Sequence, residues 1–339
     1  MRKATFFTDK HYLDNRQFDT SEKVRDNCLY MFYLLKAGFE RIGVDLSTQD
    51  INAPSHAEFI IYNEMPDAGE ETVHEKDNYL LMMESKIERM DNWDLKRHTH
   101  FRRIFTCFDE LVDNERYIKI NYGQKIPDTV DFDTGGREKL CTMIAGHKLK
   151  RHPLELYSER VKAIRWFESH HPDDFDLYGM GWDMHYFQGP FRKLNTERFV
   201  MPVLLRKLLA PDFKSYRGPV RSKNETLRKY RFAICYENAR DVPGYITEKI
   251  FDCFFAGCIP IYLGAPNVTD YIPETAFIDK RNFKTYEELY RYIKGMGEET
   301  YRGYGAAIQD FVRSGKIHPF SAGNFAKTII DIVLSDRHS

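Results

Sequence analysis

A glutamate and a lysine stand side by side where the chain is predicted to begin a helix. Thr247 is suited to cap this helix, so Glu248 and Lys249 fall in its first turn. A carboxylate there complements the helix dipole, whereas a lysine does not, because the helix N-terminus already carries about half a positive charge. An isolated pair of this kind is most often solvated surface. If a buried strand precedes the helix, however, the ammonium and the exposed backbone N–H groups together indicate a phosphate site.

The neighbouring residues predict such a strand, within one β-α-β unit. Residues 231–236 and 259–263 are short apolar runs bounded by polar residues, which is typical of buried strands in a parallel sheet. Between them, the apolar residues of 250–255 recur at the spacing of one helical face, and Gly257 is a suitable stop. Lys249 therefore lies at the carboxyl end of a strand, where open α/β sheets bind nucleotides.

The rest of the chain repeats the alternation of strands and helices. Before a loop at residues 131–137, strands are predicted at 3–8, 57–62, 79–83, 103–108 and 117–120, with a helix at 21–42 and an acidic loop around 70–75. After it, strands are predicted at 140–145, 175–178, 231–236, 259–263 and 276–278, with helices at 154–169, 195–209, 225–230, 285–293, 298–313 and 322–334. We expect an α/β protein with domains at 1–136 and 137–339. The arrangement favours GT-B, in which two Rossmann-like domains face each other across a cleft.

Composition excludes several classes of protein. The 339 residues are 42% hydrophobic and 30% charged, and the formal net charge of −1 provides no general attraction for nucleic acid. No run approaches the roughly 18 apolar residues of a membrane span. The six cysteines, at positions 28, 107, 141, 235, 253 and 258, lack metal-ligand spacing and are predicted to be reduced core thiols. These features favour a cytoplasmic protein, and they leave peripheral membrane association open.

Three segments together resemble the signature of the alpha-1,3/4-fucosyltransferases, which use GDP-fucose. They are YRFAICYEN at 230–238, GYITEKI at 244–250 and AGCIPIYLGAP at 256–266. Weaker similarity extends through DLYG at 176–179 and ES at 84–85. The resemblance implies the GT-B fold and an inverting transfer of fucose from GDP-β-L-fucose without a metal or other cofactor. The implied acceptor is an N-acetyllactosamine-like oligosaccharide of a glycoprotein or lipopolysaccharide, modified at O3 of GlcNAc.

The resemblance also implies residues that bind the donor. Breaking the anomeric C–O bond adds negative charge to the leaving diphosphate, so a site without a metal needs cationic side chains there. Lys249 and Arg160 match the family's cations, although helix spacing alone favours a surface salt bridge for Arg160. Glu248 matches the carboxylate that binds the ribose hydroxyls, and Glu237 either orients the fucose or braces Lys249. The remaining predicted donor-binding residues are Tyr178, Gly179, Lys223, Asn238, Tyr245 and Thr247.

A general base is needed to activate the acceptor hydroxyl, because single displacement requires an alkoxide-like nucleophile opposite the leaving group. Glu84 ends a predicted strand of the first domain, faces the expected cleft and matches the family's carboxylate. Burial would raise its pKa toward the working range. Glu88 is the reserve candidate, because this chain has MMESK where the family carries Glu-Asn or Glu-Ser-Pro, and a helix-capping role for Glu84 is the alternative.

Two other functions fit the same sequence. The fold could serve a donor other than GDP-fucose, or it could belong to an inactive glycan-binding relative. The presence of Arg160, Tyr245, Glu248 and Lys249 argues against the second, because a glycan-binding module has no need of a diphosphate clamp.

Overall fold

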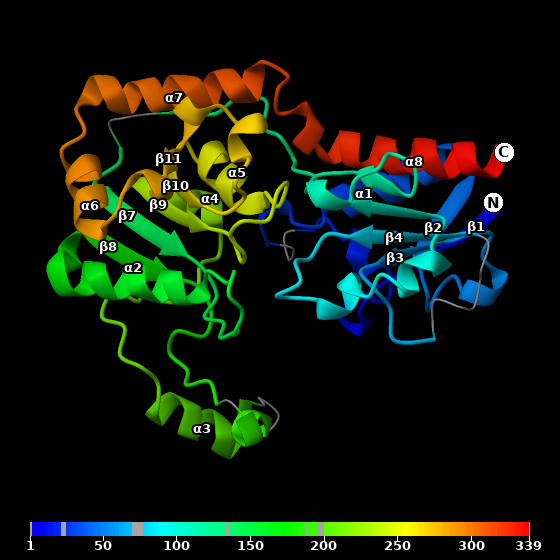
Figure 1. Ribbon diagram of the computed structural model, residues 1–339, viewed down its shortest axis with the longest axis horizontal. Coiled ribbons are helices and arrows are strands. Elements are labelled where there is room, and N and C mark those ends of the chain that lie inside the picture. The colour runs from blue at the N-terminus through cyan, green and yellow to red at the C-terminus, as the bar shows by residue number, and fades with distance from the viewer. Residues whose placement is uncertain are drawn as a thin grey trace.

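The chain folds into two α/β domains, each built on a parallel sheet (Figure 1). The computed structural model describes residues 2–21, 25–69, 77–132, 136–187, 189–195 and 200–338. The first sheet has the order β2-β1-β3-β4-β5-β6, and every neighbouring pair is parallel. Its strands are β1 (Arg2–Phe7), β2 (Val44–Thr48), β3 (Ile60–Asn63), β4 (Asn78–Met82), β5 (Arg103–Thr106) and β6 (Tyr117–Lys119).

The second sheet has the order β11-β10-β9-β7-β8 and is also parallel throughout. Its strands are β7 (Lys139–Ile144), β8 (Phe175–Tyr178), β9 (Tyr230–Tyr236), β10 (Ile259–Leu263) and β11 (Ile278–Asp279). The helices of this half of the chain are α2 (Tyr157–His170), α3 (Val200–Leu208), α4 (Lys223–Leu227), α5 (Glu248–Phe255), α6 (Tyr286–Lys294) and α7 (Glu298–Arg313). Since β8 and β9 lie on opposite sides of β7, the sheet has its topological switch point between β7 and β9.

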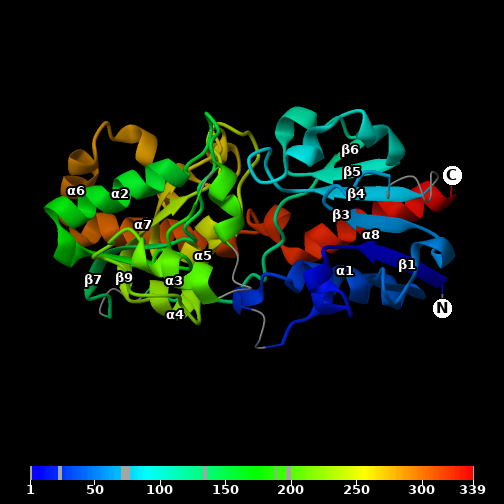
Figure 2. The same cartoon turned by 90° about the horizontal axis from the view of Figure 1, so that it is seen from below.

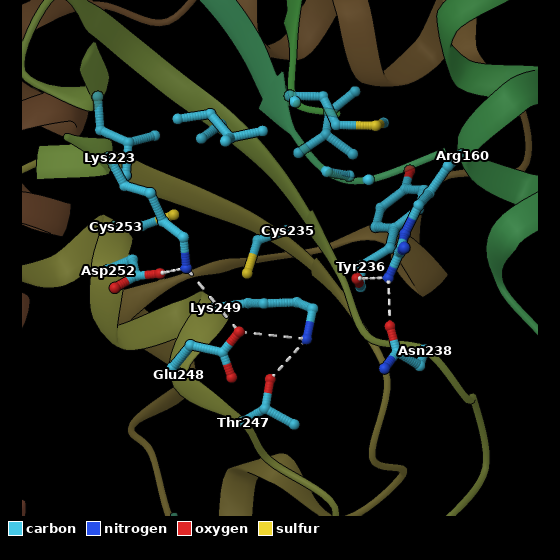
Figure 3. Close-up of a pocket in the computed structure, with 18 of the residues that line it drawn as sticks. Arg160, Lys223, Cys235, Tyr236, Asn238, Thr247, Glu248, Lys249, Asp252 and Cys253 are labelled. Carbon is cyan, nitrogen blue, oxygen red and sulfur yellow. Dashed lines mark hydrogen bonds and ion pairs between the residues drawn. The ribbon is translucent and has the colours of Figure 1, made fainter. Parts of the chain in front are cut away.

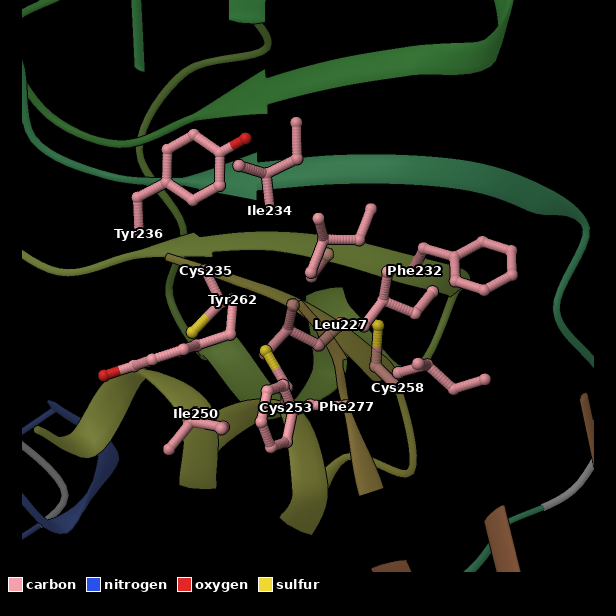
Figure 4. Packing of buried hydrophobic residues seen from close by; sticks show 14 of the residues in the cluster. Leu227, Phe232, Ile234, Cys235, Tyr236, Ile250, Cys253, Cys258, Tyr262 and Phe277 are labelled. Carbon is pink, nitrogen blue, oxygen red and sulfur yellow. The ribbon is translucent and has the colours of Figure 1, made fainter. Parts of the chain in front are cut away.

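The β9-α5-β10 unit lies at the centre of the second core, as the apolar runs predict. Ile234, Ile250 and Ile261 are at most 4% exposed, because helices cover both faces of this sheet (Figure 1). Figure 4 shows Ile234 and Ile250 among the buried side chains of this cluster. Continuous apolar runs suit strands that are buried on both sides. Five cysteines are buried as predicted, whereas Cys28 is exposed and is not a core thiol.

The first domain departs from its predicted elements at two places. Helix α1 runs over Tyr30–Arg41 rather than starting at residue 21, because Asp26 and Asn27 have left-handed backbone conformations that interrupt a helix. Strand β2 was not predicted, since its sequence VDLST mixes polar and apolar residues. Residues 70–76, which contain the predicted acidic loop, and residues 196–199 at the start of the helix predicted from 195 lie outside the described residues.

The C-terminal helix departs from the predicted division of the chain. The boundary predicted after residue 136 falls in the connection between β6 and β7 and stays a prediction. However, α8 (Ala322–His338) leaves the second domain and packs along α1 (Figure 2), where the rings of Phe32 and Phe325 are 5.9 Å apart. Its apolar face is buried in the first core, because α1 presents a matching apolar stripe. In the described part of the chain, no helix has both the length and the apolar character needed to cross a membrane.

Asp336 fixes this returning helix, and its replacement by asparagine is expected to destabilise the first domain. Its carboxylate accepts hydrogen bonds from Arg103 at 2.5 to 3.1 Å and is 3.4 Å from the Nε atom of Arg102. The Asp336 side chain is only 3% exposed. Losing these charged contacts should lower the free energy of unfolding by about 1.5–3 kcal/mol, measured by urea denaturation.

Lys327→Ala on the same helix is the matched control. It removes an ion pair with Asp331 whose side chains are 72% and 57% exposed, so the expected change is below about 0.5 kcal/mol. Equal effects of the two substitutions would contradict the role assigned to Asp336.

Candidate functional site

A cavity of about 350 Å³ lies at the carboxyl ends of β7 and β9, the switch point of the second sheet. Most of its lining comes from the second domain, and Glu84 and Tyr122 come from the first. The predicted site residues that line it are Glu84, Arg160, Gly179, Lys223, Asn238, Tyr245, Thr247, Glu248 and Lys249. The fold therefore brings together residues that are up to 165 positions apart in sequence, from Glu84 to Lys249.

Lys249 is held at the start of α5 by buried acceptors. Its ammonium donates to the hydroxyl oxygen of Thr247 at 2.9 Å and lies 3.3 Å from a carboxylate oxygen of Glu237 (Figure 3 shows the first contact). Glu237 is fully buried and accepts from both the backbone N–H and the hydroxyl of Thr247. Of the two roles predicted for Glu237, the geometry supports bracing Lys249. Thr247 occupies the N-cap position, but its hydroxyl bonds Glu237 rather than capping the helix.

Two lysines flank Glu248. Its Oε1 atom lies 3.7 Å from the ammonium of Lys249 and 3.9 Å from that of Lys223, which also donates to Asp252 at 2.7 Å (Figure 3). Burial opposes ionisation of Glu248, but the charges of Lys249 and Lys223 outweigh it and lower its pKa to about 2. Burial likewise opposes the charge on Lys249, yet Glu248 and Glu237 raise its pKa above the ordinary value. Glu248 is therefore an anion and Lys249 a cation at neutral pH.

Arg160 donates hydrogen bonds at the carboxyl end of β9. One terminal nitrogen of its guanidinium donates to the carbonyl oxygens of Tyr236 and Glu237 and to Oδ1 of Asn238, at 2.7, 2.8 and 3.1 Å. The side chain is 4% exposed, so the solvated surface salt bridge that spacing alone favoured is wrong. These bonds fix the guanidinium beside the cavity, on the same strand end as Lys249 (Figure 3).

Glu84 lines the cavity from the first domain, opposite the donor-side cations. Its buried Oε2 atom has no hydrogen-bond partner among the described residues. Burial raises the pKa of Glu84 above its ordinary value, although Lys249 counteracts it. A carboxylate with a free oxygen and a raised pKa is suited to accept a proton from a bound hydroxyl.

A second carboxyl group, that of Glu64, contacts the backbone of Glu84 and was not predicted. Its Oε1 atom accepts from the backbone N–H of Glu84 at 3.1 Å, and Asn92 donates to its other oxygen. Burial and the nearby charge of Glu84 raise its pKa to about 8. Glu64 directly follows β3 as Glu84 follows β4, so the same strand-end rule could have found it.

Of the remaining predicted residues, two line the cavity and one does not. Tyr245 and Gly179 line the cavity, and Gly179 has φ +129° where an added Cβ would collide with the carbonyl of Ala145. Tyr178 is not among the lining residues, because its hydroxyl points to that of Tyr230 at 3.0 Å. Direct donor binding by Tyr178 stays a prediction, which this contact does not support.

Glu88, the reserve base, is already engaged. Tyr157 donates to one of its oxygens, and the ammonium of Lys148 lies 3.0 Å from the other. Burial opposes the charge, but these two partners lower the pKa of Glu88 below its ordinary value. A carboxylate whose oxygens are both occupied is a poorer proton acceptor than Glu84, so the geometry favours Glu84.

Sequence reasoning also missed Asp252 and Tyr122. Asp252 follows Glu248 by four residues, so helical spacing places both beside Lys223, and this signal was available. Tyr122 donates to the carbonyl of Met83 at 2.7 Å, which fixes the residue before Glu84, and no local pattern marks it. Within the described ranges, no group of three His, Cys, Asp or Glu side chains is arranged to hold a metal ion.

Comparisons with known proteins agree with this site. Residues 211–308, which contain the β9-α5-β10 unit, match the family model described as glycosyltransferase family 10 (fucosyltransferase) C-term. An alpha-(1,3)-fucosyltransferase of Helicobacter pylori is 43% identical over 75 residues, which are 22% of this chain and 16% of that protein. An alpha-(1,4)-fucosyltransferase of Arabidopsis thaliana is 40% identical over 70 residues, 21% of this chain and 17% of that protein. The matched segments thus span about a sixth of these relatives.

The likeness in structure extends over the whole chain. A crystal structure of an alpha1,3-fucosyltransferase with GDP superposes with a TM-score of 0.59 at 16% identity, covering 98% of this chain and 90% of that one. At this identity the match establishes the fold and not the activity. The predicted GT-B fold is confirmed for the chain, and the predicted resemblance to the fucosyltransferases is confirmed by the match of residues 211–308 to the family 10 model.

Proposed function

We propose that this protein is an inverting fucosyltransferase that moves L-fucose from GDP-β-L-fucose to a glycan hydroxyl. The acceptor we propose is O3 of GlcNAc in an N-acetyllactosamine-like oligosaccharide. One observation carries the proposal: a single cavity is lined by Arg160 and Lys249 from one domain and by Glu84 from the other, and the Oε2 atom of Glu84 has no hydrogen-bond partner among the described residues. More than half of the residues that line this cavity lie in the segment 211–308, which matches the family 10 fucosyltransferase model.

The chemistry divides between the two domains. The bond between fucose C1 and the diphosphate oxygen breaks, and its electron pair leaves with GDP. Lys249, Arg160 and the N-terminal N–H groups of α5 stabilise that added negative charge. The acceptor oxygen attacks C1 from the opposite face and loses its proton to Glu84, so a β-linked donor yields an α-linked product.

Glu248 and Lys223 are assigned to the nucleoside end of the donor. Glu248 is anionic and presents two acceptor oxygens, which suits the adjacent hydroxyls of a ribose. Lys223, which itself donates to Asp252, lies on one side of this carboxylate, and Lys249 lies on the other. Cationic side chains at the diphosphate supply the positive charge that a metal ion could otherwise provide. We therefore propose that no metal ion is required. Excess EDTA should then leave turnover unchanged.

The decisive experiment measures acceptor-dependent GDP release with N-acetyllactosamine and follows the product by NMR. We expect release with GDP-fucose and an α-linked fucosyl product. Comparable turnover with GDP-mannose or UDP-sugars and none with GDP-fucose would support the alternative donor. Binding of the glycan without GDP binding or any turnover would support the inactive glycan-binding relative.

A further inference from the structure

Glu88 joins the two domains beside the cavity. It lies in the segment that follows β4 of the first domain, and both of its carboxylate oxygens contact the second domain. The hydroxyl of Tyr157, the first residue of α2, donates to Oε1. Lys148, which follows β7 and lines the cavity, approaches Oε2 at 3.0 Å. We call Glu88, Tyr157 and Lys148 the interdomain clasp.

The two contacts of the clasp differ in strength. The Glu88 side chain is 14% exposed and Lys148 is 51% exposed, so solvent screens their ion pair. Tyr157 is 3% exposed, and its ring packs in a buried cluster with residues of the first domain, among them Ile87 next to Glu88. A buried hydrogen bond to a charged acceptor is the stronger kind, so the Tyr157 contact should dominate.

Each end of the clasp contacts a segment that carries a proposed functional group. On the first domain, the amide of Glu88 donates to the carbonyl of Ser85 at 2.9 Å, in the turn that begins directly after Glu84. On the second domain, the Tyr157 ring faces the guanidinium of Arg160 at 5.0 Å, three residues along the same helix. The clasp therefore connects the segment that carries the acceptor-side carboxylate to the helix that carries a donor-side cation.

We propose that the clasp sets the distance between Glu84 and the donor pocket, and that Glu88, Tyr157 and Lys148 are positioning residues for the transfer step. This inference rests on the proposed function. Separate domains carry the two halves of the site, so reaction geometry depends on how the domains are held, and a misplacement of about 1 Å can cost about a hundredfold in rate. A bond across the interface removes part of that freedom.

Tyr157→Phe is the sharpest test, because it deletes the hydroxyl and keeps the ring in its apolar cluster. We expect kcat to fall about tenfold or more, while the Kd for GDP stays within about twofold, since Arg160 and Lys249 are untouched. Glu88→Gln should act in the same direction. The double variant should be no worse than the worse single variant, because both substitutions break one contact.

Lys162→Gln is the matched control. Lys162 lies on the same helix, is 68% exposed and pairs only with Glu159 among the contacts that the structure gives it, so its loss should leave kcat unchanged. Wild-type kcat in both Tyr157→Phe and Glu88→Gln would overturn the clasp. A parallel loss of GDP affinity and melting temperature would also overturn it, since that pattern marks general destabilisation.

Hydrogen–deuterium exchange separates failure of the clasp from failure of the proposed function. In Tyr157→Phe, exchange should rise at the amides of residues 85–88 and at the start of α2, and this readout needs no donor, acceptor or turnover. Turnover of the wild-type protein alone tests the proposed function. If the wild type is active and exchange in Tyr157→Phe is unchanged, the clasp fails and the function stands.

Discussion

Replacement of Lys249 by methionine is expected to lower kcat with GDP-fucose by about 10²–10³-fold. Methionine retains most of the side-chain volume and removes the charge that faces the diphosphate. Loss of one preorganised donor that acts on developing negative charge costs this much in other enzymes. The charge on the leaving group increases in the transition state, so kcat should fall more than donor affinity.

Lys249→Met also removes the positive charge that lies beside the buried carboxylate of Glu237. A second variant separates this effect on stability from the effect on turnover. Glu237 is fully buried and lies 3.3 Å from the lysine ammonium, so Lys249→Met should also lower the melting temperature. Adding Glu237→Gln removes the unpaired charge and should recover stability without recovering turnover. Lys327→Met, at a 72% exposed position, is the control for loss of a lysine. Recovery of wild-type turnover in the double variant would refute the role of Lys249.

Replacement of Glu84 by glutamine is expected to lower kcat by about 10²–10⁴-fold, the usual contribution of a general base. The amide is similar in size and cannot accept the acceptor's proton. The donor site lies on the other domain, so the Kd for GDP should stay within about threefold. Near-normal transfer by Glu84→Gln would show that another group is the base.

The pH profile gives an independent check on Glu84. Burial raises its pKa, and a base is active only when deprotonated, so wild-type kcat should be constant at higher pH and fall as pH drops through that raised value. The midpoint should therefore lie above the ordinary glutamate pKa of about 4.3. Glu84→Gln should lose this acidic limb. Glu88→Gln should keep it, because Glu88 has a lowered pKa and two occupied oxygens.

The sequence predicted best where neighbouring residues determine the structure. Residues 230–263 form the expected strand, helix and strand, because continuous apolar runs require burial on both faces and a helical apolar stripe requires another apolar surface beside it. The position of Lys249 in the first turn of the helix follows from the same local pattern, as do most of the parallel strands. Helix α1 was overextended, since apolar periodicity does not reveal the left-handed residues at Asp26 and Asn27.

The tertiary structure alone decided which distant residues meet. Spacing favoured a solvated Arg160, but in the fold β9 ends beside it, and the carbonyl oxygens of Tyr236 and Glu237 accept hydrogen bonds from its guanidinium. Helix α8 returns to the first domain because α1 offers an apolar stripe there, which no pattern within α8 can specify. Likewise, Glu84 and Glu88 are two similar carboxylates four residues apart. The Oε2 atom of Glu84 has no hydrogen-bond partner among the described residues, whereas Tyr157 and Lys148 of the second domain occupy both oxygens of Glu88, because hydrogen bonding depends on three-dimensional neighbours rather than on sequence position.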